Sequence, residues 1–266
     1  MIRLAVRVPR EHAELVAAEL LVLSPSGLEE RDVGDGTVEL AVYGARGELP
    51  TLPDVRAAAG DALVDVSTSE LPDDWDERWR EWHRPLDVGP LRVRPPWAPP
   101  REGALDVVIE PGQAFGTGAH PSTRLSLELL LTVPARGALA DWGCGSGVLA
   151  LAAARLGFEP VLACDVEPES VVATLAAAAA NGIVVDATVH DLRHAPGPWA
   201  PTVAANLVRP LLLEVAARME RPPERLIASG LEPHEVDEVA AAFARRGLAP
   251  AARRDGGGWS AILLIT

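Results

Sequence analysis

Apolar and polar positions follow a strand-like and then a helix-like period in the first 70 residues of the chain. Alternation with a period of two predicts strands, and apolar residues three to four positions apart predict helices. The resulting order βαββαβ predicts a small ferredoxin-like α+β domain, a scaffold that serves many functions, either as a docking module or as a dimerisation unit. The expected strands are 3–8, 27–33, 37–43 and 62–68, and the expected helices are 11–23 and 53–59, the second being the weaker.

From residue 101 onward, apolar strands alternate with helices rich in Ala and Leu. This alternation predicts a parallel sheet covered on both faces, closed by an antiparallel hairpin over 249–253 and 259–265. An apolar run over 107–109 precedes these elements. The expected strands are 137–142, 160–164, 186–190, 201–206 and 225–229, and the expected helices are 123–131, 148–156, 169–180, 209–219 and 233–246.

Residues 71–100 differ from both flanks and are predicted to connect the two domains. Trp75, Trp79 and Trp82 follow one another at helical spacing, so a short helix can bury all three on one face. Trp97 lies in a proline-rich stretch. Packing between domains and stacking on a ligand are both compatible with these tryptophans.

Composition narrows the class of protein. A chain of 266 residues with 48% hydrophobic residues fills a sizeable core, and no apolar run reaches about 18 residues. The N-terminus alternates apolar and charged residues, so we expect no signal peptide and a cytoplasmic location. Cys144 and Cys164 have neither disulfide nor metal spacing, and we expect no metal.

The net charge of −14 disfavours nucleic acid as a partner and favours a basic one. All basic side chains are arginines, because the sequence has no lysine. One Tyr and three Phe are too few for a stacking platform for single-stranded nucleic acid. A monomer is the expected oligomeric state.

The glycine-rich segment Asp141-Trp-Gly-Cys-Gly-Ser-Gly147 is the most informative motif. It follows an apolar strand and opens a helix, where glycines such as Gly143 and Gly145 let the backbone approach a ligand closely. The third glycine comes one residue earlier than in a dinucleotide-binding loop, and Asp141 disfavours a pyrophosphate. A ligand with a cationic methionine end tolerates that carboxylate, which points to S-adenosylmethionine.

Polar residues gather at the carboxyl ends of the predicted strands. Asp165 follows the next strand, 24 residues after Asp141, where a carboxylate accepts hydrogen bonds from both ribose hydroxyls. Asp191 either accepts from the adenine amino group or caps the following turn. Asn206 and Ser229 lie at the same rim.

A second glycine-rich segment, 110–123, precedes a predicted helix. Such a loop is entropically costly to order unless it binds something, so we expect Phe115, Gly116 and Thr117 to cover the ligand. His120 can act as a base or a metal ligand. The remaining histidines are scattered along the chain, which argues against a metal site.

These segments resemble the PrmA family, the methyltransferases of large-subunit ribosomal protein L-11. Residues 110–123 are similar to the family's D-P-G-x-A-F-G-T-G-x-H-x-T-T, and D-x-G-C-G-S-G and Ala-Asn206-Leu follow. Glu110, Ser122 and Ala177 depart from the usual residues. The resemblance implies a Rossmann-like class I methyltransferase domain over 101–266, a ferredoxin-like substrate-recognition domain over 1–70, and cofactor contacts from Thr123, Gly143, Asp165 and Asn206.

The implied reaction transfers methyl groups from S-adenosylmethionine to lysine or N-terminal amines of L-11. The N-terminal domain then docks the ribosomal protein and moves relative to the catalytic domain. Asn206 either orients the amine or contacts the cofactor only. Leu207, Val208 and Arg209 follow it in place of Pro-Pro-Tyr, which argues against glutamine and nucleobase acceptors. Another protein or a small-molecule amine as acceptor, and a binding protein with a vestigial site, are the alternatives.

Overall fold

The computed structural model describes residues 2–23, 28–44, 49–70, 84–111, 120–135 and 137–266. It divides into two compact units, Met1–Trp82 and His83–Thr266. The predicted helix that carries Trp75, Trp79 and Trp82 lies outside the described residues. Each unit is described by itself.

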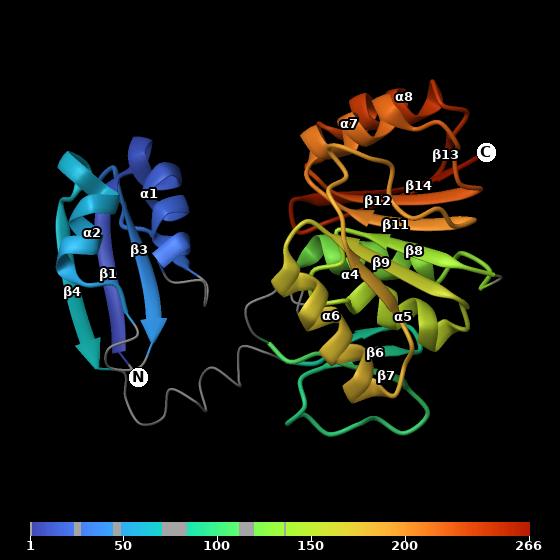
Figure 1. Cartoon of the computed structure of the whole chain (residues 1–266), viewed down its shortest axis with the longest axis horizontal. Coiled ribbons are helices and arrows are strands. Elements are labelled where there is room, and N and C mark those ends of the chain that lie inside the picture. The colour runs from blue at the N-terminus through green and yellow to red at the C-terminus, as the bar shows by residue number, and fades with distance from the viewer. Residues whose placement is uncertain (1, 24–27, 45–48, 71–83, 112–119, 136) are drawn as a thin grey trace. The chain divides into compact units, whose positions relative to one another are not determined.

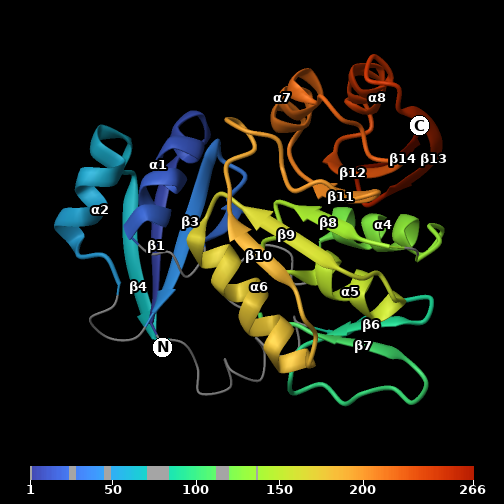
Figure 2. The same ribbon diagram turned by 45° about the vertical axis from the view of Figure 1, so that its right-hand side comes forward.

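The first unit is an antiparallel sheet with two helices on one face (Figures 1 and 2). Its strand order is β2-β3-β1-β4, which confirms the predicted ferredoxin-like arrangement. Every second side chain of the central strands, such as Val6 and Leu40, is fully buried with apolar residues of the helices. The elements are β1 (Ile2–Pro9), α1 (Arg10–Leu23), β2 (Glu29–Asp32), β3 (Thr37–Gly44), α2 (Leu52–Ala59), a 3-10 turn (Gly60–Ala62) and β4 (Asp65–Glu70).

The second unit is built on a seven-stranded sheet with the order β10-β9-β8-β11-β12-β14-β13. The first five strands of that order run parallel. Strand β14 runs antiparallel to both of its neighbours, β12 and β13, so β13 has the same direction as the first five, and the predicted Rossmann-like domain with its closing hairpin is confirmed. The strands are β8 (Leu139–Trp142), β9 (Val161–Asp165), β10 (Asp186–Val189), β11 (Thr202–Asn206), β12 (Arg225–Leu231), β13 (Ala249–Gly256) and β14 (Trp259–Ile265).

Helices cover both faces of this sheet. One face packs against α4, α5 and α6, and the opposite face packs against α7 and α8, so two separate apolar clusters form (Figures 1 and 2). Gly157 ends α5 in the left-handed conformation that favours glycine, as the sequence predicts. The helices are α4 (Pro121–Leu130), α5 (Val148–Leu156), α6 (Pro168–Asn181), α7 (Arg209–Arg218) and α8 (Val236–Ala244).

The stretch expected as a connector over 71–100 differs from the structure in its second half. Residues 84–100 belong to the second unit and contain β5 (Leu86–Val88) and β6 (Leu91–Arg94), which form a small sheet with β7 (Leu105–Val108). The alternation Leu-Arg-Val-Arg over β6 matches its burial and is a strand signal that the surrounding prolines obscure. This sheet lies under α5 and α6 (Figure 1).

Asn181, at the end of α6, ties the small sheet to the helical layer. Its side-chain amide donates to the Val108 carbonyl oxygen at 2.7 Å and its carbonyl accepts from the Val108 N–H at 2.8 Å. Arg155 of α5 adds bonds to the main-chain oxygens of Asp106 and Asn181. These contacts continue the strand-like pairing of β7 onto a helix end.

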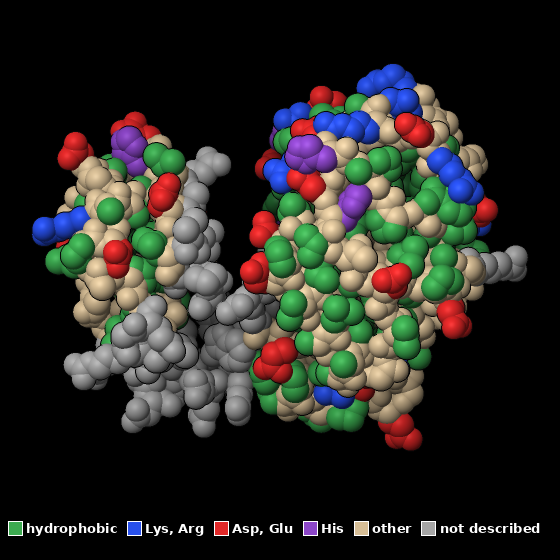
Figure 3. Space-filling view, in the orientation of Figure 1, with side chains coloured by type: hydrophobic (Ala, Val, Ile, Leu, Met, Phe, Trp, Pro, Cys, Tyr) green, Lys and Arg blue, Asp and Glu red, His purple; other side chains and the backbone are tan. Residues whose placement is uncertain are grey.

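Charged side chains are spread over the surface of the second unit. Figure 3 shows arginines gathered over the end that carries α7 and α8, and acidic side chains dispersed over the rest of the visible face. The net charge therefore marks no single docking surface on this face. Within the described residues, no helix is long and apolar enough to cross a membrane.

Asp141 joins the end of β8 to the first turns of α5. Its carboxylate accepts a hydrogen bond from the Ala150 N–H at 3.0 Å, and only 1% of the residue is exposed. The pKa of Asp141 is raised from 3.8 to about 7, mainly by burial; the Ala150 hydrogen bond opposes this rise and the neighbouring Asp165 adds to it. The carboxyl group thus belongs to the core.

We expect Asp141→Asn to change how stability depends on pH. Between pH 4 and 7 the unfolded chain releases a proton that the folded chain keeps, so this group's stabilising contribution falls as the pH rises. Asparagine accepts the same hydrogen bond and does not ionise. Urea unfolding of both proteins should show the variant gaining about 2–3 kcal/mol relative to the original chain from pH 5 to pH 8.

Other titrating groups cancel in this comparison because both proteins carry them. A difference in unfolding free energy that stays constant over the same pH range would contradict the assignment.

Candidate active site

A cavity of about 690 Å³ opens at the carboxyl ends of β8, β9 and β11. Its volume is typical of sites for small ligands, and its position is the usual one in open α/β sheets. Six of the predicted cofactor-binding residues line it, although they come from distant parts of the chain. They are Thr123, Gly143, Gly145, Asp165, Asp191 and Asn206.

The other predicted cofactor contacts do not line the described cavity. Phe115, Gly116 and Thr117 lie outside the described residues. Asp141 is buried behind the turn and bonds to Ala150, so its carboxylate supports the turn from the core. The sequence places it next to the ligand, but its side chain points to the helix side because β8 alternates faces up to its last residue.

The turn between β8 and α5 is held by the end of the neighbouring strand. The Cys164 carbonyl oxygen accepts from the N–H groups of Gly143 and Cys144, at 2.8 and 3.0 Å. Gly143 has a φ of +74°, and a Cβ there would lie 2.3 Å from the Leu207 side chain. Glycine at this position therefore lets the segment after β11 close over the turn.

Two further N–H groups of the turn are also used within the protein. Gly145 donates to the Asp165 carboxylate at 2.9 Å, and Gly147 donates to the Cys144 oxygen at 2.8 Å. A phosphate-binding loop needs several N–H groups directed at its anion. With these donors engaged and a carboxylate beside them, the turn favours a ligand without phosphate.

Asp165 has acceptor positions left for a ligand. One carboxylate oxygen accepts from Gly145 and the other accepts from the Glu167 N–H at 3.1 Å. A carboxylate offers about four lone-pair positions, so each oxygen can take one further donor. Two vicinal hydroxyl groups, as on a ribose, match this pair.

Thr123 contributes a buried hydroxyl to the cavity wall. The residue is 0% exposed, and its Oγ1 has no hydrogen-bond partner among the described residues. A buried hydroxyl without a partner is costly unless a ligand group pairs with it. A polar ligand group in the cavity would satisfy this hydroxyl.

His120 fixes the start of α4 and hence the position of Thr123. Its Nδ1 accepts from the Ser122 N–H at 3.3 Å, which makes it the N-cap of the helix. The ring packs edge to face on Trp259 of β14, with 4.7 Å between ring centroids. Burial lowers the pKa of His120, so the neutral, accepting form persists near neutral pH. Its position is structural, at the end of a helix.

Asn206 ends β11 and lines the cavity. Its side chain is half-buried and makes no hydrogen bond within the described part of the chain. A Cβ on Gly230 would lie 3.0 Å from its Oδ1, so glycine there leaves room for the amide. Ser229, at the same rim, is fully buried and pairs with Ser126 at 2.5 Å. Asn206 therefore has free donors and acceptors, whereas Ser229 does not reach the cavity.

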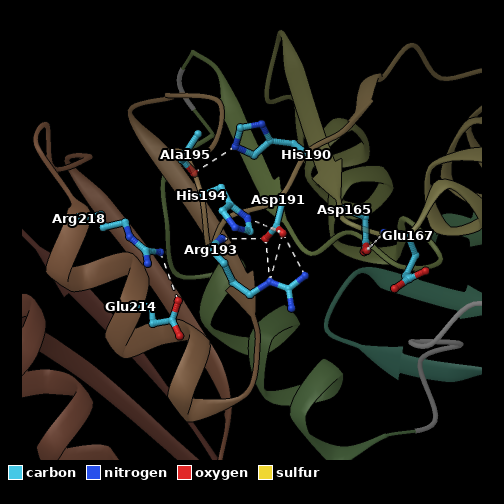
Figure 4. Close-up of polar contacts among 9 residues, drawn as sticks. All are labelled: Asp165, Glu167, His190, Asp191, Arg193, His194, Ala195, Glu214 and Arg218. Atoms are coloured by element: carbon cyan, nitrogen blue, oxygen red, sulfur yellow. Dashed lines mark hydrogen bonds and ion pairs between the residues drawn. The ribbon is translucent and has the colours of Figure 1, made fainter. Parts of the chain in front are cut away.

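Asp191 caps its own turn, which is one of the two roles that the sequence leaves open. Its carboxylate accepts from the Arg193 N–H at 2.9 Å and from the Arg193 side chain, and His194 adds a bond at 2.8 Å (Figure 4). The Arg193 hydrogen bonds hold the pKa of Asp191 well below its usual range. The group remains ionised at neutral pH.

Neither cysteine is a nucleophile in this fold. Cys144 and Cys164 are both buried, and burial raises the pKa of each thiol to about 12. The described residues contain no cluster of three or more potential metal ligands.

Several lining residues were not predicted from the sequence. Most of them adjoin strand-end residues that were predicted, so position next to a rim residue is the signal that finds them. Glu214 lies in the second turn of α7, and only the packing of α7 against the sheet brings Glu214 to the cavity. They include Val166, Glu167, Ser170, His190, Arg193 and Glu214.

Two relatives and one solved structure are similar to this chain. A chain from Geobacter metallireducens named ribosomal protein L11 methyltransferase is 36% identical over 202 residues, covering 74% of this chain and 67% of that one. A chain of the same name from Sorangium cellulosum is 35% identical and covers 90% of this chain and 81% of that one. The crystal structure of ribosomal protein L11 methylase from Lactobacillus delbrueckii subsp. bulgaricus is 25% identical, with a TM-score of 0.62, and covers 68% of this chain and 97% of that one.

The family profile described as ribosomal protein L11 methyltransferase (PrmA) matches residues 52–265. This match spans α2, β4 and the whole second unit, and it includes every described residue of the cavity. The sequence resemblance is therefore confirmed, and the chain belongs to the ribosomal protein L11 methyltransferase (PrmA) family of S-adenosylmethionine-dependent enzymes.

Proposed function

We propose that this cavity binds S-adenosylmethionine and that the chain transfers its methyl group to amino groups of ribosomal protein L11. The acceptors are lysine side chains, the N-terminal amine, or both. The observation that carries the proposal is the convergence of Thr123, the glycine turn, Asp165 and Asn206 on one cavity of suitable size. Family membership supplies the class of reaction.

The donor groups of the cavity fit this cofactor. Asp165 offers two acceptor positions to the ribose hydroxyls. The glycine turn, whose N–H groups are engaged internally, suits a nucleoside that carries no phosphate. The Thr123 hydroxyl, which has no hydrogen-bond partner in the described part of the chain, offers one more polar contact.

The cofactor supplies an electrophilic methyl group on a sulfonium, and the transfer leaves a neutral thioether. The protein must present a neutral amine in line with that methyl group. For a lysine with a pKa near 10.4, loss of the proton near neutral pH costs roughly 4–5 kcal/mol. Partial desolvation beside a positive charge lowers that cost, so positioning can suffice without a dedicated base.

Asn206 is the residue that we assign to the acceptor. Its side-chain oxygen can accept a hydrogen bond from the amine and direct the nitrogen lone pair, because no residue of the described chain occupies it. An amide does not remove the proton. Asn206 therefore orients the amine while solvent takes the proton.

The first unit and the net charge of the chain support a protein as the methyl acceptor. We assign the docking of the ribosomal protein to the first unit, which forms a compact body of its own. A net charge of −14 suits a basic partner and disfavours direct contact with nucleic acid. We further propose that the reaction takes place in the cytoplasm and that the enzyme acts as a monomer.

We expect the purified chain, incubated with methyl-labelled S-adenosylmethionine, to label L11 on amino nitrogens. Peptide mapping of the product identifies the nitrogens, because the label should appear only on lysines or on the terminal amine. Asn206→Ala should lower kcat at least tenfold and change cofactor affinity little. A free-amine mixture without protein is the control for a small-molecule acceptor.

Transfer only to small amines, or cofactor binding without any transfer, would each contradict the proposed acceptor. Equal loss of cofactor affinity and turnover in the Asn206 variant would instead make Asn206 a cofactor contact.

We expect Thr123→Val to separate stability from binding. Valine keeps the shape of threonine and removes a buried hydroxyl that has no partner among the described residues, so the free energy of unfolding should rise by about 1 kcal/mol. Loss of a hydrogen bond to the cofactor should weaken binding of S-adenosylhomocysteine by about tenfold. Thermal unfolding with and without that compound measures both effects.

Ser126→Ala is a matched control, since Ser126 is buried on the same helix and bonds to Ser229 and the Ser122 oxygen. It should lower stability and leave binding unchanged. Unaltered binding in the Thr123 variant would remove this hydroxyl from the site.

A further inference from the structure

Asp191 has no acceptor position left for a ligand. One oxygen accepts from the main-chain N–H and from Nε of Arg193, both at 2.9 Å. The other accepts from Nη2 of Arg193 at 3.0 Å and from His194 at 2.8 Å. These four donors fill the roughly four lone-pair positions of a carboxylate. An adenine amino group would have to displace one of them.

Arg193, in contrast, has capacity to spare. A guanidinium has five N–H donors, and the bonds to Asp191 use the Nε side of the fork. Its Nη1 makes no hydrogen bond within the described residues. The bidentate pairing fixes the plane of the group and leaves its faces and its far edge open. About 55% of the side chain is exposed.

The guanidinium lies at the cavity. In Figure 4 it projects from the 190–195 segment into the space between Glu214 of α7 on one side and Asp165 and Glu167 on the other. Arg193 is the one arginine among the described residues that line this cavity. A cation surrounded by several carboxylates is a poor site for an anion, but its planar face suits an electron-rich ring.

The described wall of the cavity has few other groups that can stack on a purine. It contains no Phe, Tyr or Trp among the residues described. His190 also lines the cavity, but its Nε2 pairs with the Ala195 oxygen at 3.1 Å and the ring is directed toward that residue (Figure 4). Arg193 is left as the planar side chain next to the end of the cavity that carries Asp165.

We propose that Arg193 is a cofactor-binding residue whose guanidinium stacks on the adenine ring, and that Asp191 positions Arg193 instead of contacting the adenine amino group. This inference rests on the proposed function, because it takes S-adenosylmethionine as the ligand. It assigns the contact with the adenine ring to Arg193, two positions after Asp191. Asp191 then acts on the cofactor only through the arginine.

Calorimetric titration with S-adenosylhomocysteine tests the arginine without any turnover. Arg193→Ala should weaken binding by about tenfold. Arg193→Lys should weaken it to a similar extent, because lysine keeps the charge but loses the planar fork. Arg225→Ala is the matched control: Arg225 pairs with Glu224 at 3.1 Å, neither residue lines the cavity, and its loss should leave binding unchanged.

The role of Asp191 is tested by a double-mutant cycle. Asp191→Asn should weaken binding in the original chain and have no further effect in the Arg193→Ala background. A second ligand sharpens the result, the analogue of S-adenosylhomocysteine in which hydrogen replaces the adenine amino group. Asp191→Asn should weaken both ligands by the same factor.

Two results would overturn the proposal. Unchanged binding in both Arg193 variants would remove the arginine from the site. An Asp191→Asn effect that persists without Arg193, or that is confined to the ligand with the amino group, would restore Asp191 as the direct acceptor. If the original chain itself does not bind S-adenosylhomocysteine, the proposed function fails and not the assignment alone.

Discussion

The carbonyl oxygen of Cys164 and the carboxylate of Asp165 hold the turn on which the second unit's chemistry depends. Together they take the N–H groups of Gly143, Cys144 and Gly145 at 2.8 to 3.0 Å. These bonds cross from one strand to the turn of its neighbour, so they exist only when the two strands are in register. The geometry of the turn therefore depends on correct pairing of β8 with β9.

The same strand ends carry two aspartates that occupy different environments. Asp141 and Asp165 both end strands, yet one is 1% exposed and ties β8 to α5, while the other faces the cavity. Burial raises the pKa of the Asp141 carboxyl, whereas the Asp165 carboxylate lines the cavity and has acceptor positions available. Strand-end position alone does not distinguish them.

The sequence predicts most of the fold because its apolar periods agree with the tertiary structure. Helix α5 begins and ends at the predicted residues, since a glycine turn and Gly157 mark its ends, and other element ends shift by up to three residues. Strands β5 and β6 were missed because three or four residues between prolines carry little periodic signal. Local pattern is weakest where a strand is short.

The site is predicted less completely for a different reason. Glycines and acidic residues at strand ends can be recognised in the sequence, but hydrogen bonds between side chains cannot. The residues around Asp191 do not indicate that Arg193 and His194 will donate to both of its carboxylate oxygens. Likewise Glu214 reaches the cavity only through the docking of α7. Such facts depend on three-dimensional neighbours and need the structure.

The arginines that gather over α7 and α8 have one more consequence (Figure 3). A guanidinium stays protonated at any physiological pH and never offers a neutral nitrogen nucleophile, whereas a lysine does so by losing one proton. With no lysine in the sequence, an enzyme that methylates lysine amines has a basic surface made wholly of side chains that it cannot modify. The enzyme's own side chains therefore do not compete with the acceptor for the methyl group. Every side-chain amine in a mixture of enzyme and acceptor belongs to the acceptor.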